Sequence, residues 1–259
     1  MQAIPHAERL SSHLAIQIAA QTRDPDWTLA HYTFVASVTT LASECDIAHS
    51  PAMSVASSHA VPRLQLAFFG ESAELLANYT TFLISQGNEM ELLVDEAQRA
   101  VAEHAFKVLS NEAQWQMVFR GDPDSLRTGQ ATELADNDLP AMQALAKSEQ
   151  VALKFATQDP FQQGPAFGIW ENRRLVAMGV TNLRLSGVVQ IGNVVAEKGA
   201  SERLYIAAIV SALVKAHAER RVFYIIPQQQ GATVELLETL GFVRERPMYR
   251  MCCVLNEER

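Results

Sequence analysis

The pattern of apolar and polar positions predicts alternating strands and helices in the second half of the chain. Residues 167–171, 174–185 and 188–195 have the composition of strands, and Asn172 and Arg173 form a tight turn between the first two. From residue 201 to about residue 220, apolar positions follow helical spacing, which predicts a long helix that covers a sheet. The apolar face of this helix consists of Ile206, Ile209, Val210, Leu213 and Val214.

Shorter elements complete this half. Asp136 or Asn137 is suited to cap a helix that runs to about Lys147, ahead of the first strand. Residues 222–226 form an apolar run typical of a strand buried on both faces, and a helix over 233–240 ends at Gly241. Two final strands are expected over 242–249 and 250–255.

The first half also predicts an α/β arrangement, after a helical start. Residues 14–20 and 29–41 have helical spacing, and residues 49–62 are rich in small residues and proline, which favours a loop. Strands are expected over 63–69, 89–94 and 114–119, and helices over 71–85 and 97–109. The turn-forming stretch Arg-Gly-Asp-Pro-Asp-Ser-Leu-Arg-Thr-Gly at residues 120–129 predicts a boundary, with domains at 1–122 and 123–259.

Composition supports two packed domains and excludes several functions. The chain has 259 residues, 48% hydrophobic and 19% charged, which is ordinary for a globular protein. A net charge of -8, without clustered Lys and Arg, argues against nucleic-acid binding. The chain lacks a signal-peptide core, a membrane-spanning apolar run and a disulfide framework, since its three cysteines are Cys45, Cys252 and Cys253. We therefore expect a soluble, cytoplasmic protein without a membrane role.

Two classes of site are disfavoured by the distribution of histidine and cysteine. Only His217 of the seven histidines lies in the second half, where we expect it on the outer part of the long helix. A Ser-His-Asp or Cys-His site in this half is therefore unlikely to form. No histidine pair has helical metal spacing and no Cys-x-x-Cys occurs, so we expect no metal site.

Several stretches, in this order, resemble one family. They are Trp-Gln-Met-Val-Phe-Arg-Gly-Asp-Pro from residue 115, Phe-Gly-Ile-Trp-Glu-Asn-Arg-Arg-Leu-Val-Ala-Met from residue 167, Ile-Gly-Asn-Val-Val from residue 191, and Leu-Leu-Glu-Thr-Leu-Gly-Phe from residue 236. With the order of elements, they make the chain similar to the GNAT superfamily of N-acetyltransferases, in a branch where a divergent α/β domain comes first. The resemblance covers most of the chain and is strongest after residue 112.

The resemblance implies a fold, a reaction and a binding site. The fold is α/β (α+β), with a mixed, mainly antiparallel sheet flanked by helices and preceded by a second α/β domain. The activity is transfer of an acetyl group from acetyl-CoA, the cosubstrate, to a small-molecule or peptide amine, in a possible homodimer. In such enzymes the central strand diverges from its neighbour and main-chain groups bind the thioester, at positions that match Val194, Val195 and Ala196. Ordinary sheet core is the alternative interpretation of these valines.

This sequence departs from the phosphate-binding pattern of the family. The family has Arg or Gln, two residues, Gly, one residue, then Gly or Ala at the start of the long helix, where free N–H groups bind an anion. Here Ser201, Leu204 and Ile206 hold those positions. Glu202 adds a carboxylate that competes for the helix dipole, while Arg203 is either a phosphate ligand or a solvated arginine. Ser201 is expected as the N-cap.

Catalytic candidates are few. Leu237 stands where family members often carry a tyrosine acid, which leaves Tyr205 and Tyr249 as substitutes or as packing residues. Tyr205 also lies in the stretch that corresponds to the cofactor site. Glu197 is the candidate base, or else a solvated loop carboxylate. Gln230 replaces polar residues that help to hold the cofactor arm in relatives.

Two hypotheses about function follow from these residues. The first is an acyl-CoA-dependent N-acetyltransferase with an unidentified amine acceptor. The second is a catalytically degenerate binding or assembly module of the same fold, with weak or no CoA binding, as Ser201, Glu202, Leu204 and Leu237 suggest.

Overall fold

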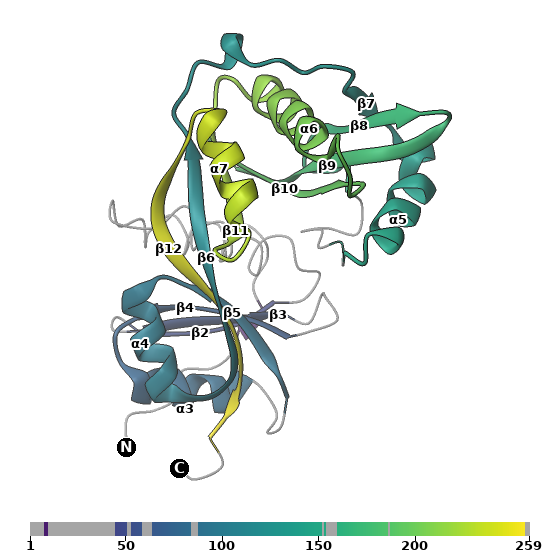
Figure 1. The fold of residues 1–259 in the computed structure, drawn as a ribbon. Coiled ribbons are helices and arrows are strands. Elements are labelled where there is room, and N and C mark those ends of the chain that lie inside the picture. The colour runs from purple at the N-terminus through teal and green to yellow at the C-terminus, as the bar shows by residue number, and fades with distance from the viewer. Residues whose placement is uncertain are drawn as a thin grey trace. The chain divides into compact units, whose positions relative to one another are not determined.

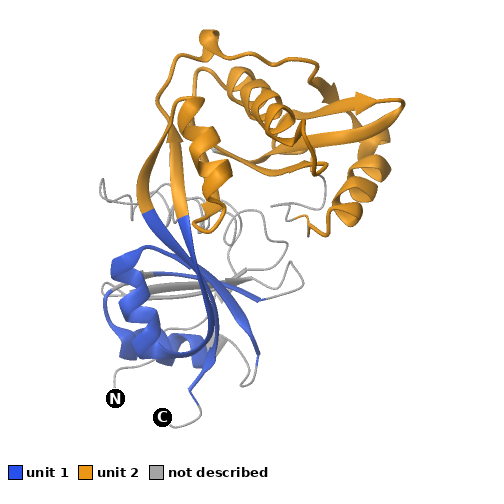
Figure 2. Ribbon diagram, viewed as in Figure 1, with its two compact units in different colours: residues 1–114, 247–259 blue, residues 115–246 orange. Residues whose placement is uncertain are grey.

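The structure, a computed structural model, describes residues 8–9, 45–50, 53–58, 64–83, 88–151, 153, 160–185 and 187–256. The chain forms two compact units (Figure 2): unit 1 is Met1–Gln114 with Pro247–Arg259, and unit 2 is Trp115–Arg246. The predicted boundary at residue 122 differs from this division, which also assigns the C-terminal residues to unit 1. The helices predicted over 14–20 and 29–41 lie outside the described residues.

Unit 2 is a mixed sheet with helices packed on it (Figure 1). Its strand order is β12-β6-β11-β10-β9-β8-β7, and β6 and β12 each also contribute residues to unit 1. The elements in chain order are β6 (Phe106–Phe119), η1 (Pro123–Ser125), β7 (Thr132–Leu134), η2 (Asp136–Asp138), α5 (Leu139–Ser148), β8 (Ala166–Glu171), β9 (Arg174–Leu185), β10 (Val188–Ala196), α6 (Glu202–Ala216), β11 (Arg221–Pro227), α7 (Gly231–Thr239) and β12 (Phe242–Leu255).

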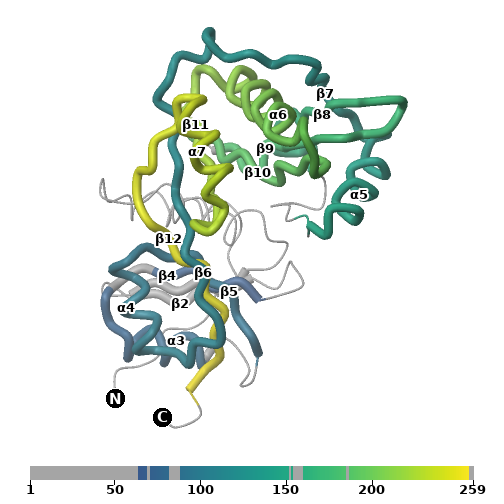
Figure 3. The backbone as a smooth tube through the Cα atoms, in the orientation of Figure 1, coloured from purple at the N-terminus to yellow at the C-terminus, as the bar shows by residue number. Residues whose placement is uncertain are grey.

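The predicted order of elements in the second half is confirmed. Asn172 and Arg173 have positive φ angles of 48° and 63°, which a two-residue hairpin turn between β8 and β9 requires. The predicted split of the last segment is wrong, because β12 is one 14-residue strand. Figure 3 shows its backbone running beside β6.

The ends of the helices differ from their predicted positions. Neither Asp136 nor Asn137 caps α5; instead the Asp138 carboxylate accepts a hydrogen bond from the Ala135 N–H at 2.9 Å. The helix α6 ends at Ala216, and turns follow it to residue 220. The strand β7 was not predicted, because three residues are too few to carry a periodic pattern.

Among the described residues of unit 2, two apolar clusters hold the helices to the sheet. The larger one joins α6 and α7 to the sheet, and α6 contributes an almost continuous buried segment from Ala208 to Val214. The smaller one joins α5 to β8 and β9 through Met142, Leu145 and Met178. Burying one large apolar side chain stabilises the folded state by about 1.5–3 kcal/mol. These clusters are therefore the main source of the stability of unit 2.

Unit 1 contains a sheet of strand order β1-β2-β3-β4-β5-β12. Residues 45–50 and 53–58 form an antiparallel pair, so the loop predicted over 49–62 is wrong where the structure describes it. The helix predicted over 97–109 ends at Ala105, because Phe106 is already extended and begins β6. The elements are β1 (Glu8–Arg9), β2 (Cys45–Ser50), β3 (Met53–Ser58), β4 (Leu64–Gly70), α3 (Ala73–Leu83), β5 (Met90–Val94), α4 (Glu96–Ala105), β6 and β12.

The two units have the same topology. In unit 1, β1 to β4 pair antiparallel in succession, α3 follows, and β5 returns parallel to β4. In unit 2, β7 to β10 pair antiparallel in succession, α6 follows, and β11 returns parallel to β10. A helix and a long strand then come next in each case, α4 with β6 and α7 with β12. The first domain is thus an α/β unit, as predicted, and it repeats the second.

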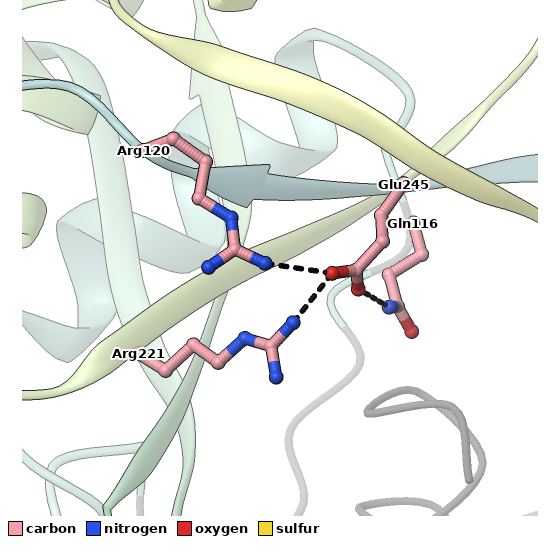
Figure 4. Close-up of polar contacts among 4 residues, drawn as sticks. All are labelled: Gln116, Arg120, Arg221 and Glu245. Carbon is pink, nitrogen blue, oxygen red and sulfur yellow. Dashed lines mark hydrogen bonds and ion pairs between the residues drawn. The ribbon is translucent and has the colours of Figure 1, made fainter. Parts of the chain in front are cut away.

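A cluster of polar side chains joins three strands of unit 2 (Figure 4). Glu245 on β12 accepts hydrogen bonds from Arg120 Nη2 at 2.9 Å, from Arg221 on β11 and from Gln116 on β6. The Glu245 side chain is only 19% exposed, so its partners replace most of its water. Charge-assisted bonds of this kind are the stronger hydrogen bonds of proteins.

We expect Glu245→Ala to lower the free energy of unfolding by about 1–3 kcal/mol, because Gln116 and two arginines lose their acceptor. Glu238→Ala is the matched control, since Glu238 forms an ion pair with Arg244 in which both side chains are about 40% exposed. That loss should stay below about 0.5 kcal/mol. Urea denaturation measures both values, and equal losses would contradict a special role for Glu245.

Gly179 permits α6 to lie close to β9. A Cβ at this position would come within 2.6 Å of Ile209 Cγ2 and 3.1 Å of Leu213 Cδ1. We therefore expect Gly179→Ala to destabilise the protein by about 1–3 kcal/mol. Gly231→Ala, where a Cβ meets nothing within 4 Å, should be neutral or slightly stabilising. Thermal unfolding of both variants checks the difference, and an unaffected Gly179 variant would show that α6 can shift freely.

Candidate functional site

The central strand β10 carries an irregularity in its second half. Gly192 pairs with Val180 and Val195 with Met178, so three steps on β10 match two steps on β9. This is a β-bulge, and Asn193 within it has a positive φ of 47°. Asparagine tolerates this conformation better than most residues. The bulge turns main-chain groups of β10 away from regular pairing.

On its other side, β10 separates from β11. The parallel pairing runs from Val188–Arg221 to Ile191–Tyr224 and goes no further, although β10 continues to Ala196 and β11 to Pro227. Within the described residues, the main chain of 192–196 therefore has no ladder partner on β11. The divergence that the resemblance implied for the central strand is confirmed.

The predicted cofactor-binding residues of β10 lie beside this gap. Val194 is half-buried and directs a methyl group toward Gly179, on the side of α6. Val195 packs in the cluster of α5 and Ala196 in the cluster of α6, both at less than 9% exposure. The side chains of Val195 and Ala196 are thus buried and that of Val194 packs half-buried against the core, while the main chain of all three borders the gap.

Tyr224 also lies at the gap, and the sequence analysis did not single it out. It forms the last pair of β11 with β10, and its ring packs against the cluster of α6 and α7. Burial raises the pKa of Tyr224 to about 12, and a backbone hydrogen bond from Val194 opposes this increase. Because that bond lowers the pKa of a phenol, the Val194 N–H is the donor. The signal in the sequence was a single hydroxyl among the apolar residues 222–226.

The start of α6 has the backbone of an anion site and unsuitable side chains. Gly199 has a φ of 154°, and Ser201 is the N-cap as predicted, although its side chain makes no capping hydrogen bond. Leu204 is 71% exposed and Arg203 is exposed, whereas Ile206 packs against the core. Glu202 lies in the first turn, where its carboxylate interacts favourably with the helix dipole.

The two catalytic candidates near α6 both have ionic or hydrogen-bonded partners. The carboxylate of Glu197 accepts two hydrogen bonds from the Arg174 guanidinium, one of them at 2.8 Å. The hydroxyl of Tyr205 donates to Glu171, and this bond is the main cause that raises the pKa of Tyr205. Neither side chain is poised to exchange a proton while these pairs persist.

The other two candidates, Tyr249 and Gln230, belong to other elements of the fold. Tyr249 belongs to unit 1, where the Arg99 guanidinium carbon lies 4.4 Å from its ring centroid and a hydrogen bond to Glu96 raises its pKa. Gln230 is exposed at the N-cap of α7, without a side-chain capping bond. Residues 194–197, 201–206 and Tyr224 thus belong to unit 2, where Val194, Ala196, Tyr205, Ile206 and Tyr224 pack in or against one apolar cluster, whereas Tyr249 belongs to unit 1.

His217 is buried, so its expected position on the outer part of the helix is wrong. It is 2% exposed, directly after α6. The Thr181 hydroxyl donates to Pro165 O at 2.8 Å and therefore accepts from His217 Nε2, also at 2.8 Å. His217 Nδ1 has no partner among the described residues. Burial is the main cause that lowers the pKa of His217 to about 4.

This pKa predicts a loss of stability in mild acid. Above pH 6.5, His217 is neutral in both states; as the pH falls toward 4, only the unfolded chain binds the proton. The wild type should lose about 3 kcal/mol more than His217→Gln over this range. Urea denaturation at several pH values measures the difference. His104→Gln, at an exposed site, is the control, and parallel curves for wild type and His217→Gln would contradict the assignment.

The part of the chain that is described has no group of three or more His, Cys, Asp or Glu side chains arranged to hold a metal ion. In the same residues, no helix has both the length and the apolar character needed to cross a membrane.

Comparison with known proteins identifies the fold. No family model matches the chain, and no curated protein matches it. A Drosophila protein of known structure has a TM-score of 0.70 at 14% identity, over 96% of this chain and 98% of that chain. A GNAT-family acetyltransferase from Colwellia psychrerythraea gives 0.63 at 11%, over 96% and 100%. A tandem GNAT protein of clavulanic acid biosynthesis gives 0.62 at 10%, over 96% and 98%. The chain has the GNAT fold, as predicted.

Proposed function

We propose that unit 2 binds acetyl-CoA between β10 and β11 and transfers its acetyl group to an amine. The observation that carries this proposal is the end of the β10–β11 ladder at Ile191 and Tyr224, beside the bulge where β10 leaves β11. Backbone N–H groups fixed in this way can hold a thioester and polarise it without reorganisation. The GNAT fold of the acetyltransferases that the chain resembles supports the same ligand.

The pyrophosphate is the part of the ligand that fits least well. The N–H groups at a helix start suit an anion in general, and Arg203 is exposed at this one, although the Glu202 N–H already donates to the Gly199 carbonyl at 3.2 Å. Glu202 opposes a phosphate by its charge, and Leu204 brings a branched side chain where the family has glycine. We therefore expect weaker CoA binding than the fold alone would provide, with Ser201 and Tyr205 at the edge of the site.

The proposed reaction needs no dedicated acid or base. A neutral amine attacks the thioester carbonyl, the C–N bond forms, and the C–S bond breaks to release CoA thiolate. Orientation of the two reactants supplies much of the rate, and solvent takes the proton from the nitrogen. Glu197 remains the proposed base only if Arg174 releases it. The acceptor is a small-molecule or peptide amine, and the proposed enzyme acts in the cytoplasm.

A degenerate binding module is the second candidate. Leu204 favours it, because its branched side chain stands at the helix start, where a diphosphate needs close access to the backbone amides. In this case the gap between β10 and β11 persists as a relic of the fold. The two functions differ in whether acetyl-CoA stabilises the chain.

Thermal unfolding with and without millimolar acetyl-CoA distinguishes them. A ligand at 100 times its Kd stabilises the folded protein by about 2.7 kcal/mol, which moves Tm by several degrees. We expect a measurable rise for wild type and a larger one for Glu202→Arg with Leu204→Gly, which removes the carboxylate and bares the helix start. Ligand-induced shifts are compared, because glycine in a helix lowers Tm by itself.

The control variant is Glu219→Arg, which makes the same charge change at an exposed site after the end of α6. Its shift with acetyl-CoA should equal that of wild type. If acetyl-CoA stabilises neither wild type nor the double variant, acetyl transfer is wrong and the binding module remains. If the double variant and Glu219→Arg respond alike, the pyrophosphate does not lie at the start of α6.

A further inference from the structure

One main-chain N–H beside the gap, which could donate to the thioester carbonyl, already makes a hydrogen bond within the protein. Val194 lies in the bulge of β10, and its N–H is one of the groups that the gap leaves without a ladder partner on β11. This N–H donates to the hydroxyl oxygen of Tyr224. A main-chain N–H makes one strong hydrogen bond at a time. The carbonyl of a ligand in the gap must therefore take a different donor or displace the phenol.

The hydroxyl of Tyr224 is suited to be that donor. A phenol that accepts through oxygen still has its own hydrogen to donate. Tyr224 keeps this hydrogen at neutral pH, because burial raises its pKa to about 12. The bond from Val194 N–H draws charge from the oxygen and strengthens the hydrogen as a donor, as in other hydrogen-bonded chains.

The position of the ring supports this assignment. Tyr224 forms the last parallel pair before the strands separate, so its side chain starts at the base of the gap. Val222 and Ile226, two positions away on β11, belong to the same cluster under α6 and α7, and this alternation fixes the face on which the ring lies. Packing thus holds the ring, and the hydrogen bond with Val194 places its hydroxyl at the bulge.

We propose that Tyr224 is a catalytic residue that donates a hydrogen bond from its hydroxyl to the thioester carbonyl, with Val194 N–H as the group that orients and polarises it. This inference rests on the proposed function. When the amine attacks, the π electrons of the carbonyl move to its oxygen, and the hydrogen bond from Tyr224 strengthens with that charge. The phenol keeps its proton throughout. The electrons return when the C–S bond breaks, and the thiolate leaves.

The test compares two ligands that differ only in the acyl group. Isothermal titration of the full chain with acetyl-CoA and with CoA gives two affinities, and their ratio reports contacts to the acetyl carbonyl. Tyr224→Phe should weaken acetyl-CoA about five-fold, the usual strength of one neutral hydrogen bond, and leave CoA within about two-fold. Loss of packing alone would weaken both ligands equally.

Tyr79→Phe is the matched control, because it removes a hydroxyl from a buried tyrosine in the core of unit 1. Its ratio should equal that of wild type. If Tyr224→Phe does not fold, Tyr224→Met keeps apolar bulk at the site and enters the same titrations.

The titrations distinguish failure of the role of Tyr224 from failure of the proposed function. An unchanged ratio in a folded Tyr224 variant that binds CoA overturns the role of Tyr224 and leaves the proposed function intact. Tighter binding of acetyl-CoA to Tyr224→Phe also overturns it, since the phenol would then block the Val194 N–H. If neither ligand binds wild type, the proposed function fails and the role of Tyr224 fails with it.

Discussion

The need of buried backbone groups for hydrogen bonds shapes unit 2. A parallel ladder satisfies β10 and β11 up to Ile191 and Tyr224, and beyond that point the bulge and the divergence leave main-chain groups to find other partners. One such group, the Val194 N–H, takes the hydroxyl of a tyrosine from the facing strand. The ligands that unit 2 can bind in the gap between β10 and β11 therefore depend on which protein atoms already take these hydrogen bonds.

Tight packing keeps this arrangement in place. Gly179 allows α6 to approach β9 closely, and the buried segment of α6 lies directly on the diverging strands. Glu245 joins β6, β11 and β12 through Gln116, Arg120 and Arg221, so β11 is anchored on the side away from β10. The gap is thus a property of a rigid sheet and not of a loose loop.

The sequence predicts the elements of unit 2 well, because strands and helices there have clear periodicity and sharp turns. It fails where tertiary structure overrides local pattern: Phe106 leaves a helical run for a long strand, and β12 continues through Tyr249 and Arg250 where two strands were expected. The bulge at Asn193 has no compositional signature, and Tyr224 stands in a strand that looks wholly apolar. Ion pairs such as Arg174 with Glu197 join residues far apart in sequence, which no local pattern reveals.

The long strand β12 has a consequence for how the protein is made. Its second half pairs with β5 and supplies Met251, Cys253 and Leu255 to the core of unit 1. The ribosome synthesises these residues only after the whole of unit 2. Unit 1, whose synthesis begins first, is therefore completed last. Until then the exposed edge of β5 is open to wrong partners, and the waiting time is set by synthesis rather than by the speed of folding.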